Sequence, residues 1–168
     1  MSEPLDIVEI CWSGPHSPEE VFTTMNGPAD YGLYACYGTH SIFGPDALLY
    51  IGKADQQRFF ERVRQSVEGW MSGEASAVDV YLGRLGGTST MTKDEESAWD
   101  ERIRRVERLL IYSCQPPYNG TGLSKPPQLR PTLVLNHGRR HRLTHAATSL
   151  SWDSQFGTPD WHAFSMPD

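Results

Sequence analysis

The sequence predicts an α+β fold, an α/β sandwich in which a small, mainly antiparallel central β-sheet of about three strands is flanked by helices. Two segments rich in apolar, β-branched and aromatic residues, 32–37 and 47–51, are separated by a connection containing Gly, Pro and Asp, the pattern of two strands joined by a loop. Residues 78–85 alternate well enough for a third strand. Amphipathic patterns over 55–70 and 92–114 predict the flanking helices.

The segments on either side of these elements carry weaker patterns. Residues 7–12 read as a short strand or as a segment that lies against the core. Ser17, followed by Pro18 and two glutamates, is typical of a helix N-cap, and we expect that helix to end near residue 25. Residues 132–135 predict a strand, 136–138 a turn, 139–145 a basic return strand and 151–168 an irregular tail.

Both long helical patterns place charged side chains at or inside an apolar face. Asp55 is the expected cap of the first helix. Arg62 and Arg64 lie on opposite flanks of its apolar stripe, about 100° from the centre, so the periodicity alone does not choose between them. Glu107 lies inside the apolar face of the second helix. A buried carboxylate is costly unless it is protonated, paired or bound to a metal, and its pairing with a neighbouring Arg is the simplest alternative.

Charge is distributed unevenly along this single 168-residue domain, whose formal net charge is −6. Residues 1–31 contain six acidic residues and no Lys or Arg, whereas residues 102–142 contain nine Lys or Arg and only one acid. A local basic field can hold a phosphate backbone whatever the net charge. Segregation of two solvated faces is the alternative explanation, and the charge pattern does not decide between them.

Compartment and membrane contact are indicated by composition. No apolar run approaches the roughly 20 residues that span a bilayer, and the acidic N-terminus is unlike a signal peptide, so we expect no membrane partner. The three cysteines, Cys11, Cys36 and Cys114, are odd in number and lack CxxC spacing. Reduced thiols in a cytoplasmic protein are the simplest interpretation.

Two tripeptides, Gly32-Leu33-Tyr34 and Tyr50-Ile51-Gly52, resemble the signature of the GIY-YIG nuclease family. Gly32-Leu33-Tyr34 matches the first with Leu in place of the middle Ile, and Tyr50-Ile51-Gly52 matches the second, directly followed by Lys53 as in the family's excision-repair members. Glu107 opens the string ERLLIYSCQPPYN, whose Glu, Pro and Asn have the spacing that ends the family's catalytic core. The resemblance covers roughly residues 30–120, and it leaves residues 1–29 as an N-terminal extension and 121–168 as a C-terminal extension.

The resemblance implies a hydrolytic site for phosphodiester bonds. One Mg²⁺ ion, with Mn²⁺ as a substitute, would be held by the Glu107 carboxylate together with waters. Arg62, rather than Arg64, would hold phosphate oxygens, because the family's Arg precedes a hydrophobic residue. Tyr34 would take the proton from water, provided that positive charge from Lys53 and Arg62 lowers its pKa. The implied catalytic residues are Tyr34, Tyr50, Lys53, Arg62, Glu107 and Asn119.

Further expectations concern residues around that site. Tyr50 would orient the water or phosphate, and Asn119 would brace the site. Ser66 stands four residues after Arg62, where the family has His or Tyr; a serine can form a hydrogen bond to the substrate or to Tyr34 but cannot act as a base near neutral pH. In the C-terminal extension, we expect Arg139, Arg140 and Arg142 to contact substrate phosphates.

Two interpretations of function follow. The first is a metal-dependent endonuclease that cleaves DNA through a GIY-YIG active site, and the resemblance leaves restriction, repair and phage or mobile-element roles open. The second is a catalytically weakened module with the GIY-YIG fold that binds DNA or another partner, and the serine at position 66 motivates it. Metal-dependent cleavage separates the two.

Overall fold

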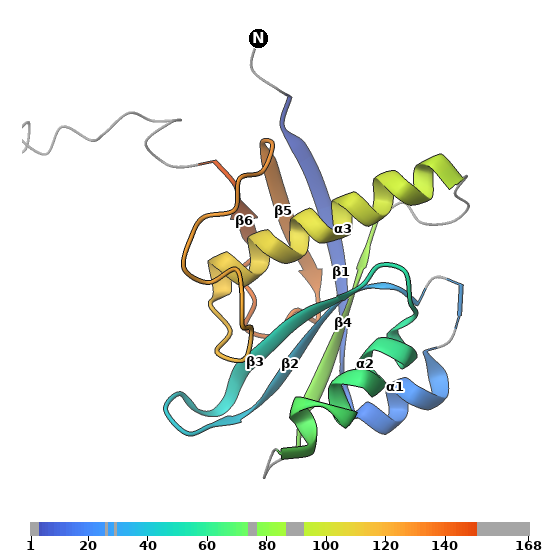
Figure 1. Cartoon of the computed structure of the whole chain (residues 1–168), viewed down its shortest axis with the longest axis vertical. Coiled ribbons are helices and arrows are strands. Elements are labelled where there is room, and N and C mark those ends of the chain that lie inside the picture. The colour runs from blue at the N-terminus through green and yellow to red at the C-terminus, as the bar shows by residue number, and fades with distance from the viewer. Residues whose placement is uncertain (1–3, 26, 29, 74–76, 87–92, 151–168) are drawn as a thin grey trace, which may run out of the picture.

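The computed structural model of the chain describes residues 4–25, 27–28, 30–73, 77–86 and 93–150, with only the backbone of 93–97 (Figure 1). Its helices are α1 (Pro18–Thr24), α2 (Phe59–Glu68), the single 3₁₀ turn η1 (Trp70–Gly73) and α3 (Lys93–Cys114). Its strands are β1 (Asp6–His16), β2 (Gly32–His40), β3 (Gly44–Ala54), β4 (Asp79–Leu85), β5 (Thr132–Gly138) and β6 (Ala146–Thr148).

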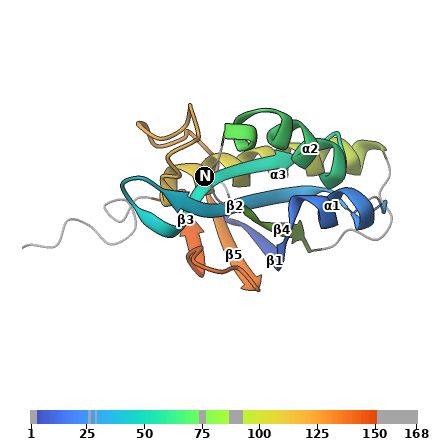
Figure 2. The same cartoon turned by 90° about the horizontal axis from the view of Figure 1, so that it is seen from below.

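The sheet is larger than the sequence predicted. Six strands form one curled, mixed sheet in the order β3-β2-β4-β1-β5-β6, so the expected three-stranded sheet flanked by helices is wrong (Figure 2). All neighbours are antiparallel except β1 and β5, which pair in parallel, with Asp6 opposite Thr132 and Trp12 opposite Gly138. The two segments expected to be extensions therefore contribute strands, and β1 lies between β4 and β5 inside the sheet.

Alternation along β2 sorts the core into two layers. Leu33, Ala35 and Tyr37 pack in a cluster with the buried side chains of α3 and β1. Tyr34 and Cys36 point the other way, into a cluster with α1 and α2. This is the period-2 separation expected of a strand that is buried on both faces. Figure 1 shows α3 crossing the sheet while α1 and α2 lie beside each other.

Several predicted element boundaries need correction. The helix expected to begin at Asp55 begins at Phe59, after Arg58 as N-cap residue. The predicted turn at 136–138 belongs to β5, and the predicted return strand at 139–145 is a loop followed by the short β6. The expected start of the long helix at residue 92 and the irregular tail at 151–168 lie outside the described residues. Within the described part of the chain, no helix has the length and apolar character to cross a membrane.

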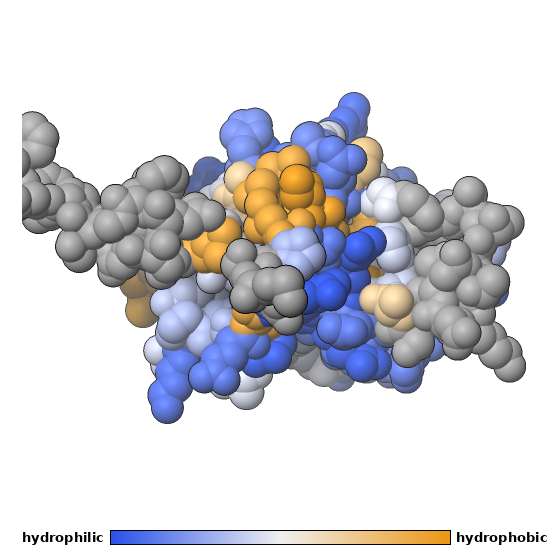
Figure 3. All heavy atoms as spheres, turned by 90° about the horizontal axis from the view of Figure 1, so that it is seen from above, coloured by the Kyte–Doolittle hydropathy of each residue, from blue (hydrophilic) through white to orange (hydrophobic). Residues whose placement is uncertain are grey.

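The end of the sheet where β1 begins has a mixed surface. Leu5 and Ile7 are exposed to 45% and 54%, and the carboxylate of Asp6 between them pairs with three arginines, Arg102, Arg105 and Arg130. In the view from above, a hydrophobic patch adjoins a hydrophilic area (Figure 3). The arginines belong to α3 and to the segment that leads into β5, so Asp6 ties these two elements to β1.

Candidate active site

Tyr34 is fully buried on the α2 side of β2. Its Oη lies 3.0 Å from Oγ of Ser66, which α2 positions and which is itself 7% exposed. Gly52 lies opposite on β3, and a Cβ at this position would overlap the Tyr34 ring. The glycine of the second tripeptide therefore has a local reason, since only a residue without a side chain leaves room for the tyrosine of the first.

Burial sets the protonation state of Tyr34. It raises the pKa of the phenol far above its ordinary value, and the neighbouring Tyr50 raises it further. The hydrogen bond with Ser66 and the charge of Arg62 lower the pKa, but they offset only part of the effect of burial. The sequence-based expectation was that Lys53 and Arg62 make this phenol acidic enough to act as a base. In this structure Tyr34 is a neutral phenol at pH 7.

Tyr50 belongs to the same face and is partly exposed. Its ring centroid lies 5.9 Å from that of Tyr34 and 5.6 Å from that of Trp70 in η1. Trp70 in turn meets the ring of Tyr118, with centroids 5.4 Å apart. Aromatic pairs at these separations add packing energy beyond area burial and restrict ring orientation. Sequence reasoning did not identify Trp70 and Tyr118, which hold Tyr50 in place.

Arg62 lies on the flank of α2 that faces the site. Its backbone oxygen accepts a hydrogen bond from Oγ of Ser66 at 3.3 Å, as the four-residue spacing requires, and its Nη1 donates to Gln65 at 2.8 Å. Its charge acts on both the Tyr34 hydroxyl and the Glu107 carboxyl. Arg64 instead lies over the ring of Phe22 in α1, 5.4 Å from its centroid. The geometry thus places Arg62, and not Arg64, beside the other predicted site residues.

Glu107 and Lys53 meet where α3 crosses the edge strand β3. The Lys53 Nζ lies 3.7 Å from Oε2 of Glu107 and 3.2 Å from Oδ2 of Asp55. The Glu107 side chain is only 16% exposed, and burial raises its pKa above the ordinary value, although the charge of Lys53 counteracts this. The distance to Lys53 is longer than a hydrogen bond, so the carboxylate is paired but not saturated.

The role of helix cap that the sequence predicted for Asp55 is wrong. Asp55 caps no helix; its Oδ2 accepts a 2.9 Å hydrogen bond from Nε of Arg104 and also faces Lys53. Partial burial raises the pKa of Asp55, but the Arg104 hydrogen bond and the Lys53 charge outweigh it, so the pKa lies below its ordinary value. A carboxylate two residues after the predicted catalytic lysine was the only available signal in the sequence.

Asn119 closes the edge of the sheet beside Ile51. Its Oδ1 accepts from the backbone N–H of Ile51 at 2.9 Å, and its Nδ2 donates to the Ile51 carbonyl at 2.8 Å. The preceding residue, Tyr118, donates its backbone N–H to the Leu49 carbonyl. Asn119 therefore replaces a neighbouring strand at this point of the sheet edge. By fixing the backbone of Ile51, it also fixes the positions of the two adjacent residues, Tyr50 and Gly52.

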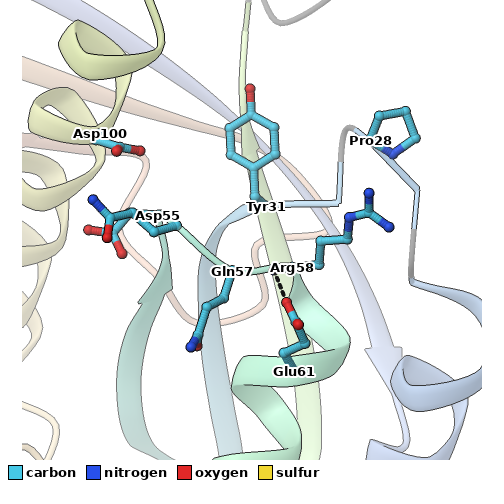
Figure 4. Close-up of a pocket in the computed structure, with 8 residues that line it drawn as sticks. Pro28, Tyr31, Asp55, Gln57, Arg58, Glu61 and Asp100 are labelled. Carbon is cyan, nitrogen blue, oxygen red and sulfur yellow. Dashed lines mark hydrogen bonds between the residues drawn. The ribbon is translucent and has the colours of Figure 1, made fainter. Parts of the chain in front are cut away.

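A cavity of about 320 Å³ opens beside Asp55, between the segment that precedes β2 and the start of α2 (Figure 4). Asp55 and Asp100 lie on one side of it, and Pro28 and Arg58 lie on the other, where the Arg58 backbone N–H donates to Glu61 at 3.0 Å. Three carboxylates and one guanidinium line it together with Tyr31, Gln56 and Gln57. This charge balance disfavours a phosphate, so a nucleic-acid backbone would pass outside this cavity.

The predicted phosphate contacts of the C-terminal segment lie elsewhere. Arg139, Arg140 and Arg142 follow β5, and each has a partner within the fold. Nη1 of Arg139 donates to the Gly14 carbonyl at 3.3 Å, Arg140 contacts the Leu143 carbonyl and His145, and Nη2 of Arg142 lies 2.9 Å from Oδ2 of Asp46. Within the described part of the chain, none of these partners is one of the residues around Glu107.

The residues around Glu107 fit one hard divalent cation. Among the described residues there is no group of three or more His, Cys, Asp or Glu side chains arranged to hold a metal. Mg²⁺ does not need such a group, because it keeps several waters and takes one or two carboxylates. Glu107, whose carboxylate oxygens still have room for a ligand, is the residue that would hold the ion. Asp55 supplies a second carboxylate nearby, because it pairs with the same residue, Lys53.

In comparisons with known proteins, no family model, no curated protein and no solved structure matches the chain.

Proposed function

We propose that the chain is a metal-dependent endonuclease that hydrolyses phosphodiester bonds in DNA. The observation that carries the proposal is the gathering of the predicted side chains from four separate elements. Tyr34 of β2 contacts Ser66 of α2, Lys53 of β3 pairs with Glu107 of α3, and the charge of Arg62 acts on both groups.

These residues supply the functions that phosphodiester hydrolysis needs. The guanidinium of Arg62 binds non-bridging phosphate oxygens in a planar, bidentate manner, and Lys53 adds positive charge beside the leaving oxygen. Tyr34 and Ser66 form a buried, hydrogen-bonded hydroxyl pair beside Tyr50, and the partly exposed Tyr50 would orient a water next to the phosphate. A Mg²⁺ ion held by Glu107, when bound, stabilises charge on the phosphate and makes water more acidic.

The second candidate is a catalytically weakened module with the same fold that binds DNA or another partner. Two observations favour it: Ser66 cannot serve as a base near pH 7, and burial raises the pKa of the Tyr34 phenol to which it is bonded. A module of this kind would bind DNA through the same Arg and Lys side chains without cleaving it.

Incubation with plasmid, linear and single-stranded DNA, with and without Mg²⁺ or Mn²⁺, separates the candidates. The endonuclease nicks or linearises the plasmid only when metal is present, and the Glu107→Gln variant prepared in parallel does not. Binding without cleavage by the parent protein supports the weakened module. The three unpaired thiols, Cys11, Cys36 and Cys114, support a reducing compartment, and we place this activity in the cytoplasm.

A further inference from the structure

A second cavity, of about 310 Å³, lies on the outer side of α3 against residues 128–130. Four arginines line it, Arg104, Arg105, Arg108 and Arg130, and Glu101 is the only acidic residue among the described residues of the lining. Because Glu101 is 71% exposed, solvent screens most of its charge. The lining is therefore basic, in contrast to the acidic cavity beside Asp55.

Arg105 is built into the wall of this cavity and is short of partners. Its side chain is 5% exposed, and its Nε and Nη1 have no hydrogen-bond partner among the described residues. Only Nη2 is satisfied, by Asp6, while Nη1 lies 3.7 Å from Glu101, which is too far for a hydrogen bond. Buried donors without acceptors are rare, because leaving them unsatisfied costs stability.

The positive charge around Arg105 is also incompletely neutralised. Arg102, Arg105 and Arg130 share the single carboxylate of Asp6. Burial, followed by the charge of Arg130, lowers the pKa of Arg105 below its ordinary value. Arg108 is exposed and has no hydrogen bond or ion pair within the described part of the chain. An anion with several acceptor oxygens would satisfy both the orphaned donors and the excess charge.

The cavity adjoins the candidate active site through Arg104. This residue lines the cavity and donates its Nε to Asp55, which faces Lys53, which in turn faces Glu107. Arg108 follows Glu107 directly on α3, and Arg104 and Arg108 are one turn apart, about 6 Å along the helix axis. A group bound in the cavity would therefore lie next to whatever occupies the site at Glu107.

We infer that this arginine cavity binds a backbone phosphate of the DNA strand, adjacent to the phosphate that is cleaved. The inference rests on the proposed function, because it takes the ligand to be the substrate of that site. The contact positions the strand and carries no sequence information. It assigns substrate binding to arginines of α3 that the sequence analysis treated only as part of the basic stretch at 102–142.

Arg108→Gln tests the inference, with Arg64→Gln as its matched control. Both side chains are exposed helical arginines, and each substitution removes one positive charge, but Arg64 lies on α2 over Phe22. Binding of a short duplex is measured by fluorescence anisotropy in EDTA across a range of salt concentrations. Arg108→Gln should weaken binding about tenfold and reduce the slope of log K against log salt by about 0.9. Arg64→Gln should leave both within error.

A nuclear magnetic resonance experiment reads the buried donor directly. The Nε–H signal of Arg105 should shift when the duplex is added, and it should shift much less in Arg108→Gln. If inorganic phosphate alone moves the signal while Arg108→Gln binds duplex like the parent, the cavity holds a free anion and the assignment to DNA is overturned. Equal effects of the Arg108 and Arg64 substitutions overturn it as well.

These outcomes are separable from failure of the proposed function. A parent protein that cleaves DNA, together with an Arg108→Gln variant that binds normally, overturns the cavity and leaves the endonuclease intact. A parent that never cleaves, but loses affinity through Arg108→Gln and not through Arg64→Gln, supports the cavity as a DNA contact and overturns the endonuclease. Thermal unfolding of each variant excludes loss of fold as the cause.

Discussion

The two halves of the sheet are each held by one buried asparagine, but they surround it with different chemistry. In the half formed by β3 and β2, Asn119 bonds to both backbone groups of Ile51, which follows Tyr50 directly and precedes Lys53 by two residues. In the half formed by β1, β5 and β6, Asn136 accepts from Nε1 of Trp12 and donates to the Thr144 carbonyl, next to aliphatic core residues. The first half carries Tyr34, Lys53 and Glu107, whereas the second carries a different charged cluster, Asp6 with its arginines, at the start of β1.

We interpret this difference as a separation between positions that are proposed to act on DNA and positions that stabilise the fold. A lysine, two carboxylates and a neutral buried phenol surround β3 at or near its contact with α3 and α2. Such groups do not stabilise a small domain efficiently, because desolvation offsets much of what pairing contributes. Their gathering around β3 is a pattern typical of a functional site. Arg105 and Asp6 form a second buried charged pair at the start of β1, so buried charge alone does not separate the two halves.

The largest expected effect is that of Glu107→Gln in the β3 half. The amide keeps the size of the side chain but removes the negative charge that would hold a divalent cation, so metal-dependent cleavage should be lost. Supercoiled-plasmid cleavage in Mg²⁺ measures this, with circular dichroism as the check on folding. A variant that cuts at the parent rate would show that Glu107 holds no essential metal.

The same substitution should change how stability depends on pH. Burial raises the pKa of Glu107 in the folded state, so the folded chain holds this proton to a higher pH than the unfolded chain does. The parent therefore loses stability as pH rises from the unfolded pKa, about 4.3, through the raised folded pKa, and Glu107→Gln does not. In metal-free buffer at pH 7 the variant should be slightly more stable. Urea unfolding at pH 4 and pH 7 compares them, and a less stable variant at pH 7 would contradict the assignment.

The second prediction sets the two asparagines against each other. Asn136→Ala leaves the buried Trp12 Nε1 without an acceptor and should cost about 1–3 kcal/mol of unfolding free energy. Asn119→Ala should cost a similar amount, because it strips both backbone groups of Ile51. Only the second should also lower the cleavage rate measured well below the unfolding temperature, since Tyr50 and Gly52 flank Ile51. Equal losses of activity would break the distinction between the halves.

The same division explains what the sequence could predict. The hairpin of β2 and β3 is local. About twenty residues contain all the signals that predict it: the alternation of its strands, its turn residues and the glycine opposite Tyr34. Helix periodicity placed Glu107 inside an apolar face. That Ser66 lies near Tyr34 was implied by the resemblance to the GIY-YIG family and not by the spacing itself. The order of the strands in the sheet could not be predicted. Asp6 pairs with Thr132, which is far away in the sequence, and no local pattern specifies the partner of a parallel strand.

Within the site, the missed features are those that depend on tertiary packing. Asp55 has the local appearance of a helix cap, but α2 starts four residues later, at Phe59, and Arg104 from α3 takes the carboxylate instead. The pKa of Tyr34 depends on how much α2 and η1 cover it, which no sequence spacing reveals. The arginines of α3 have a helical pattern typical of a solvated face. They line a cavity because residues 128–130 pack against this face of the helix, which the helical pattern does not predict.

The third prediction, Ser66→His, has an intermediate effect within the β3 half. The serine hydroxyl lies 3.0 Å from Oη of Tyr34, so a histidine here would place a basic nitrogen near the same phenol. Cleavage near neutral pH should be preserved or rise by up to about 10²-fold where proton transfer limits the rate. The larger ring should cost about 1–3 kcal/mol of stability, because the site is 7% exposed. Rate profiles of parent and variant from pH 6 to pH 9 measure the effect; a folded variant without activity would show that another group accepts the proton.

The smallest effect is expected from replacing Arg139, Arg140 and Arg142 with Ala in the other half. Each of these side chains already has a protein partner, and Asp46 neutralises Arg142, so fewer counterions remain to be released on DNA binding than their number suggests. We expect the slope of log K against log salt to fall by at most about one for the triple variant, which is less per residue than for Arg108→Gln alone. Anisotropy titrations of both variants on the same duplex compare them directly. If the triple variant loses two or three phosphate equivalents while Arg108→Gln loses none, the strand would leave the site across the end of β5 and not along the arginine cavity.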